Sequence, residues 1–192
     1  MMLHPAAADL FAAGQFETVA NVLTAVHALG LISTPIIFLG ALGLSQRLAS
    51  PDRLSLAALV AYGFGLAAIM NAAVASGFLA PSLGRRIEAA SGSAVDVWRV
   101  AFRYNGEVNQ AYALVFVVAS SVAIVLWSVS ILRGRVFDHG VGYYGCVLGP
   151  ATLALVLSGH LTLGVHGFGM IVLSQTIWFV IAAVLLWRTG HK

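Results

Sequence analysis

The sequence predicts an all-α integral membrane protein, a five-helix transmembrane bundle with one interfacial amphipathic helix. Of its 192 residues, 60% are hydrophobic and only 9% are charged, whereas soluble domains carry about 25% charged residues. So few charges cannot cover the surface of a soluble fold. The apolar stretches are long and continuous, while a transmembrane β-barrel would show alternating segments of about ten residues instead.

Five segments reach the length of about 20 mostly apolar residues that crosses a bilayer. They cover residues 19–44, 54–79, 111–132, 141–163 and 167–186, so that residues 1–192 form a single transmembrane domain. Pro35 and Pro150 fall inside spans, where they predict kinks rather than ends. Pro81 and Gly84 predict the end of the second span.

An amphipathic helix is predicted at residues 94–104, between the second and third spans. The residues of its apolar face recur at spacings of three and four and continue in the same phase past residue 104: Val95, Trp98, Phe102, Asn105, Asn109 and Tyr112. Asp96, Arg99 and Arg103 lie on another face, and the Asn105-Gly106 pair favours a bend. Such a helix lies in the membrane interface, with Trp98 at the level of the lipid headgroups.

The basic residues predict the orientation in the membrane. With five spans, six Lys and Arg residues collect on one side and four on the other, all four in one longer loop. We therefore expect the N-terminus outside and the C-terminus in the cytoplasm. The short hairpins and the SGFLAP sequence at residues 76–81 resemble those of small bacterial membrane proteins, so we expect the bacterial inner membrane. Because the basic residues are scattered over several loops, nucleic acid is excluded as a partner.

The polar residues of the spans gather in one half of the bilayer, which we expect to be the outer half. Polar groups are costly in hydrocarbon and usually face the interior of a bundle. We predict that they line a polar pocket that opens toward the outer surface, and the pocket residues are His27, Asn71, Asn105, Glu107, Asn109, Tyr112, His160 and His166.

Such a pocket suits a lipophilic small molecule, which the protein would bind or transform. In an enzyme, Glu107 would act as general acid and His27 or His166 as base, while the other pocket residues would contact the ligand. Each residue also has a structural interpretation. Glu107 pairs with Arg103 one turn earlier, Asn71 joins two helices, and His160 contacts water at the interface.

Two other classes of function stay open. His27, His160 and His166 are candidate ligands for a transition metal or a haem, although their spacing matches no known motif. Alternatively, the chain is a non-catalytic helper subunit in a larger membrane complex or a homo-oligomer, since its glycines allow close helix packing. Whether the protein is an enzyme is left open.

Overall fold

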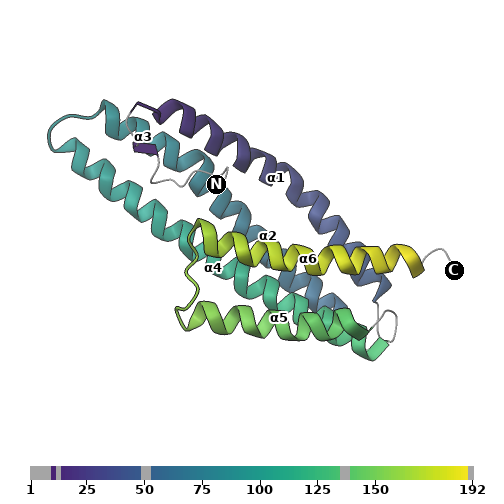
Figure 1. Cartoon of the computed structure of the whole chain (residues 1–192). Coiled ribbons are helices and arrows are strands. Elements are labelled where there is room, and N and C mark those ends of the chain that lie inside the picture. Colours follow the sequence, from purple (N-terminus) through teal and green to yellow (C-terminus); the bar gives the residue numbers. More distant parts are fainter. Residues whose placement is uncertain (1–9, 12–13, 49–52, 135–138, 190–192) are drawn as a thin grey trace. The chain divides into compact units, whose positions relative to one another are not determined.

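The computed structural model describes residues 10–11, 14–48, 53–134 and 139–189 (Figure 1). Within these ranges the chain is helical and has no strand. Its long elements are α1 (Phe16–Arg47), α2 (Leu54–Val74), a π-helix (Ala75–Leu79), α3 (Ala80–Ala89), α4 (Ala94–Gly134), α5 (His139–Leu157) and α6 (Val165–Thr189). Leu10 and Phe11 form a short 3₁₀ turn before α1.

Five helical stretches of the described chain are long and apolar enough to cross a membrane. They are Phe16–Arg47, Leu54–Ala89, Ala94–Gly134, His139–Leu157 and Val165–Arg188. The second stretch combines α2, the π-helix and α3. Four of the five apolar segments read from the sequence lie wholly inside these stretches, and the prediction of five long apolar helices is confirmed.

The amphipathic segment 94–104 and the third apolar segment 111–132 form one helix, which corrects the prediction of two. α4 runs unbroken for 41 residues, about 62 Å at 1.5 Å per residue, or twice the hydrocarbon thickness of about 30 Å. Residues 105–110, NGEVNQ, contain no proline. The single Gly106 costs a helix only about 1 kcal/mol relative to alanine, which does not break it.

The fourth apolar segment ends earlier than residue 163, because α5 stops at Leu157. Gly159 follows with φ of +76°, a left-handed conformation that glycine adopts without steric cost and that commonly ends helices. The Leu161 N–H donates to the Leu155 carbonyl at 2.9 Å and closes the turn. His160 therefore lies in a loop. If α5 continued to residue 163, His160 would share a helix face with residues 149–156, and it does not.

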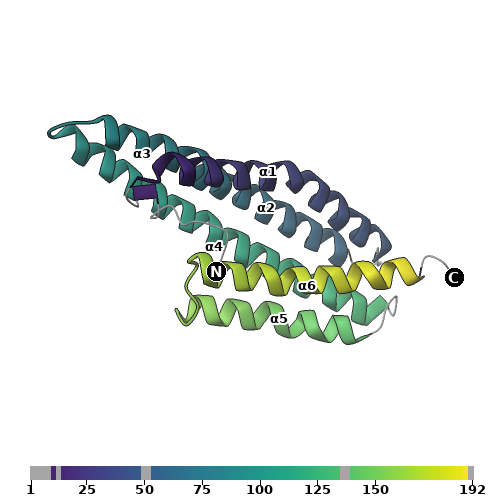
Figure 2. The ribbon, with the colours of Figure 1, turned by 45° about the horizontal axis from the view of Figure 1, so that its top comes forward.

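The chain forms two compact units. Unit 1 contains Met1–Pro35 and Ala68–Ala113, and unit 2 contains Ile36–Ala67 and Leu114–Lys192. In unit 1 the first half of α1 runs beside the π-helix and α3 (Figure 2). A buried apolar cluster joins these elements to the N-terminal turn, with Phe102 and Val19 packed against it. Its members are Leu10, Phe16, Ala20, Leu23 and Ala80.

Aromatic side chains form the core of unit 2. Trp127 of α4 and Trp178 of α6 are both 0% exposed, and their rings stack with centroids 6.1 Å apart. Trp127 Nε1 donates to Ser45 Oγ at 2.9 Å, and Trp178 Nε1 donates to the Val141 carbonyl at 3.1 Å. Each buried indole N–H is thus hydrogen-bonded, as burial of a polar group requires.

Three glycines bring α5 against α4 in unit 2. Gly142, Gly145 and Gly149 are buried, and a Cβ at any of them would collide with α4 side chains. At Gly145, for instance, it would contact Ser128 Oγ and come within 2.5 Å of Trp178 Nε1. Small residues at such spacings are typical of close helix packing in membrane proteins.

Candidate functional site

Unit 1 contains an irregular stretch of helix at the π-helix Ala75–Leu79. Pro81 sits in the first turn of α3 directly after it, and proline has no N–H to donate to the carbonyl four residues earlier, which belongs to Gly77. The chain continues as a helix because π-type bonding absorbs the mismatch: the Ala80 N–H donates to the Ala75 carbonyl, five residues back. Pro81 therefore does not end the helix, contrary to the sequence-based expectation.

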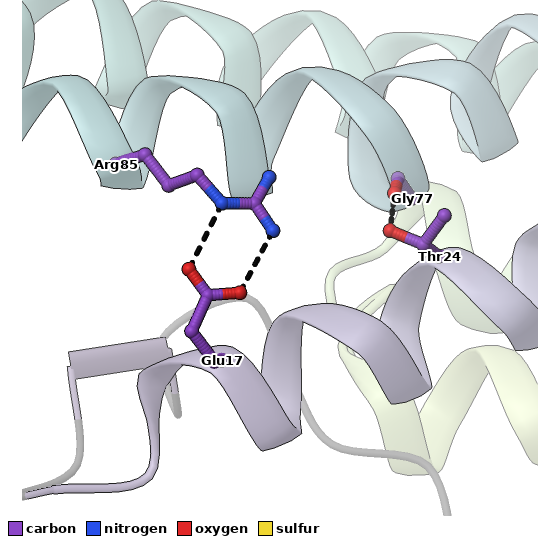
Figure 3. Close-up of polar contacts among 4 residues, drawn as sticks. All are labelled: Glu17, Thr24, Gly77 and Arg85. Carbon is purple, nitrogen blue, oxygen red and sulfur yellow. Dashed lines mark hydrogen bonds and ion pairs between the residues drawn. The ribbon is translucent and has the colours of Figure 1, made fainter.

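Two neighbouring helices supply donors to the carbonyls of this π-helix. Thr24 Oγ1 of α1 donates to the Gly77 carbonyl at 2.7 Å (Figure 3). Asn105 Nδ2 of α4 donates to the Ala75 carbonyl at 3.0 Å. In membrane helices, backbone groups released by proline are commonly satisfied by side chains of adjacent helices. We call these five residues, Thr24, Ala75, Gly77, Pro81 and Asn105, the π junction.

His27 packs on the π junction from α1. A Cβ at Gly77 would collide with His27 Cβ and lie 2.7 Å from its Cγ, so the absence of a side chain at Gly77 allows the two helices to approach. His27 Nδ1 lies 2.7 Å from the Leu23 carbonyl. Because a carbonyl only accepts, Nδ1 is the donor in this contact.

An ion pair joins α1 to α3 at the exposed edge of unit 1. Arg85 Nε and Nη2 donate to the two carboxylate oxygens of Glu17, each at 3.0 Å (Figure 3). Both side chains are about half exposed or more, at 49% for Arg85 and 64% for Glu17. Solvent screens such a pair, so the bidentate geometry orients the two helices more than it stabilises the fold.

A cleft of about 300 Å³ opens in the same unit. Its apolar lining comes from three segments distant in sequence: Phe11 in the N-terminal turn, Ile87 in α3 and Phe102 in α4. The Phe11 and Phe102 rings meet edge to face, with centroids 5.4 Å apart. Phe11 also lies 6.3 Å from Phe16 of α1, centroid to centroid, which ties this wall to the buried cluster. We call this feature the aromatic cleft.

Two arginines of α4, Arg99 and Arg103, complete the lining of the aromatic cleft. Arg99 Nη1 lies 3.9 Å from Asp96 Oδ1, and both side chains are exposed. The expected pair of Arg103 with Glu107 is absent: within the described residues neither side chain forms an ion pair. In the same unit, the Arg86 guanidinium lies 4.8 Å above the Trp98 ring.

The pocket residues expected from the sequence lie in both units. In unit 1, Asn105 belongs to the π junction, and Phe102 packs against the buried cluster. Both side chains thus face the interior of unit 1, in agreement with the apolar helix face predicted from their spacing. His27 and Asn109 are partly buried, whereas Asn71, Glu107 and Tyr112 are exposed. The shared cavity of His27, Asn71 and Asn109 stays a prediction.

The other two histidines belong to unit 2, and both are exposed. Ser158 Oγ and His160 Nδ1 are hydrogen-bonded at 2.8 Å within the loop after α5. His166 lies in the first turn of α6. Among the described residues, no group of three or more His, Cys, Asp or Glu side chains is placed to hold a metal ion. The hypothesis that the histidines bind a metal therefore gains no support.

Four contributors to the π junction and the aromatic cleft were not singled out from the sequence: Thr24, Ala75, Gly77 and Ile87. Phe11 lies in a short segment before the first span, where no periodicity reveals the partner it packs against. Thr24 and Gly77 pair across 53 residues of chain. Pro81 gave one indication of this contact. A proline inside a continuing helix leaves a backbone carbonyl without its usual N–H donor, so a side chain of another helix is expected to supply one.

No family model matches the chain, and no curated protein or solved structure shows significant similarity to it.

Proposed function

We propose that this chain is a multi-pass protein of the bacterial inner membrane that binds a lipophilic small molecule in the aromatic cleft. The observation that carries the proposal is the cleft itself. Three apolar side chains from three separate segments line a volume of about 300 Å³, which lies at the lower end of the range for small-molecule sites, about 300–1,000 Å³. Apolar walls with a few charged groups are typical of such sites.

The polar residues of the spans have a supporting role in this proposal. Thr24 and Asn105 satisfy the carbonyls of the π junction, and His27 packs on Gly77. These contacts hold α1 and α4 against the π-helix. We assign them to the framework of unit 1 and the binding of the ligand to the aromatic cleft.

The proposed orientation places the N-terminus outside and the C-terminus in the cytoplasm, as the basic residues favour. The turn between α3 and α4 then faces outward, and so does the aromatic cleft, whose lining residues Ile87 and Arg99 flank this turn. The ligand would enter from the outer leaflet.

A photoactivatable diacylglycerol tests the proposal, because this lipid is lipophilic and uncharged. The purified full chain is irradiated with it in detergent micelles, and the labelled peptides are mapped by mass spectrometry. We expect saturable labelling of the peptides that contain Ile87 and Phe102. Ile87→Trp should weaken it, since the larger indole occupies part of the cleft.

Val97→Trp is the matched control. It adds the same indole to α4 at a side chain that is 64% exposed and is not part of the cleft lining, so labelling should be unchanged. The proposal is wrong if label spreads evenly over all apolar helices, or if Ile87→Trp is labelled as strongly as the native chain. A thermal unfolding curve for each variant shows that it is folded.

A further inference from the structure

We propose that the ligand of the aromatic cleft is an anionic phospholipid and that Arg99 and Arg103 bind its phosphate group. This inference rests on the proposed function, since it names the chemical class of the molecule held in the same cleft. It is carried by the charges along the cleft, by their position relative to the apolar span, and by the mixed polarity of the lining.

The two arginines form a pair of like charges that a single carboxylate, Asp96, offsets in part. They lie four residues apart on α4, one helical turn, where like charges repel. Asp96 offsets Arg99 only across 3.9 Å, and Arg103 has no ion pair within the described chain. An anion between the two guanidinium groups removes this repulsion. Guanidinium groups bind phosphate oxygens through paired, charge-assisted hydrogen bonds.

A third arginine of unit 1 lies over an aromatic ring. Arg86 of α3 stacks over the ring of Trp98, 4.8 Å from its centroid, an arrangement that orients the guanidinium. Tryptophan is enriched where membrane and water meet, because its ring is apolar and its N–H is polar. Arg86, Trp98 and the two arginines of the cleft thus combine positive charge with an interfacial aromatic ring.

Both arginines of the cleft lie beyond the outer end of the apolar segment of α4. Arg103 precedes residue 111, where the apolar segment of α4 begins, by eight residues, or about 12 Å along the helix axis. The headgroup layer extends about 5–8 Å beyond the hydrocarbon. Arg99 lies one turn farther out, twelve residues before residue 111, or about 18 Å along the axis. Binding to both guanidinium groups therefore requires the lipid phosphate to rise beyond the headgroup layer.

The apolar lining selects a lipid over a free phosphate ion. Phe11, Ile87 and Phe102 provide walls that inorganic phosphate cannot use, whereas they suit the glycerol backbone and the first methylenes of an acyl chain. A volume of about 300 Å³ accepts this part of a phospholipid and leaves the remaining acyl chains in the bilayer.

Competition between two phospholipids tests the inference. The purified full chain is equilibrated in detergent with equal amounts of phosphatidylglycerol and phosphatidylcholine, and the lipid that it retains is measured by native mass spectrometry. We expect the native chain to retain phosphatidylglycerol about tenfold over phosphatidylcholine, a factor that corresponds to about 1.4 kcal/mol. The double variant R99Q/R103Q should retain the two lipids almost equally.

Arg188→Gln is the matched control, since it removes an exposed arginine at the end of α6 in unit 2, and it should keep the tenfold preference. Equal retention of the two lipids by the native chain overturns the inference, and so does displacement of phosphatidylglycerol by excess inorganic phosphate. If diacylglycerol still labels the cleft in that case, the proposed function stands and only the anionic ligand is wrong. If that labelling is absent as well, both proposals fall.

Discussion

Substitution of Gly77 by alanine tests the close approach of α1 to the π-helix. The added Cβ would collide with His27 Cβ, lie 2.7 Å from its Cγ and lie 3.2 Å from its Nδ1. The first of these atoms is fixed to the α1 backbone, so rotation of the His27 side chain cannot relieve the collision. The two helices must separate, which also stretches the bond from Thr24 Oγ1 to the Gly77 carbonyl.

The magnitude follows from three contributions. Overpacking a tight contact costs about 1–3 kcal/mol, and a weakened hydrogen bond adds about 0.5–1.5 kcal/mol. Replacing a helical glycine by alanine returns about 1 kcal/mol. The net loss of unfolding free energy is therefore about 0.5–3.5 kcal/mol. At roughly 2–4 °C per kcal/mol for a chain of this size, the apparent Tm should fall by several degrees.

The assay is thermal unfolding in detergent micelles, followed by circular dichroism. Gly106→Ala is the control, because this helical glycine has nothing within 4 Å of the added Cβ, and it should hold or raise the Tm. Combining Gly77→Ala with His27→Ala should give little relief, since alanine retains Cβ, the nearest of the three colliding atoms. Combining it with His27→Gly should recover the part of the loss that is due to the collision.

A Gly77→Ala chain that unfolds at or above the native Tm would refute this reasoning, because the helices then do not meet at Gly77. Equal recovery with His27→Ala and His27→Gly would refute it in a narrower way. The obstacle would then be the imidazole ring rather than Cβ.

Two further predictions concern unit 2 and the membrane topology. Ser128 Oγ is buried and has no hydrogen-bond partner among the described residues, whereas Ser130 Oγ donates to the Leu48 carbonyl at 3.2 Å. Ser128→Ala should therefore keep or raise the Tm, while Ser130→Ala should lower the unfolding free energy by about 0.5–1.5 kcal/mol; equal losses would contradict this. In a background without the native cysteine, a membrane-impermeant thiol reagent should label Gly164→Cys in intact cells and Arg188→Cys only after permeabilisation. Labelling of both from one side would exclude five crossings.

The long helices were predictable because a bilayer imposes one simple requirement, about 20 apolar residues in a row. Their limits were less predictable, since hydropathy marks where hydrocarbon ends and not where hydrogen bonding ends. α4 illustrates the difference: its apolar half matches the predicted span, while its polar half continues the same helix without a break. The sequence alone indicated a separate helix there because hydropathy changes at residues 105–110.

The site was predictable only where one helix face carried the information. The three- and four-residue spacing of α4 correctly placed Phe102 and Asn105 on one face. The contacts from Thr24 to Gly77 and from Phe11 to Phe102 depend on which helices become neighbours. Spacing within one segment cannot reveal such pairings.

His27 shows why residue type alone was a poor guide to binding. A histidine in an apolar span suggested a pocket wall, yet its Nδ1 bonds to a carbonyl of its own helix and its stem meets the backbone of Gly77. Local bonding thus removes much of the cost of burying the ring. Arg103 has no such bond within the described chain. Residue type alone therefore does not separate a polar residue that the fold already satisfies from one that is left to bind a ligand.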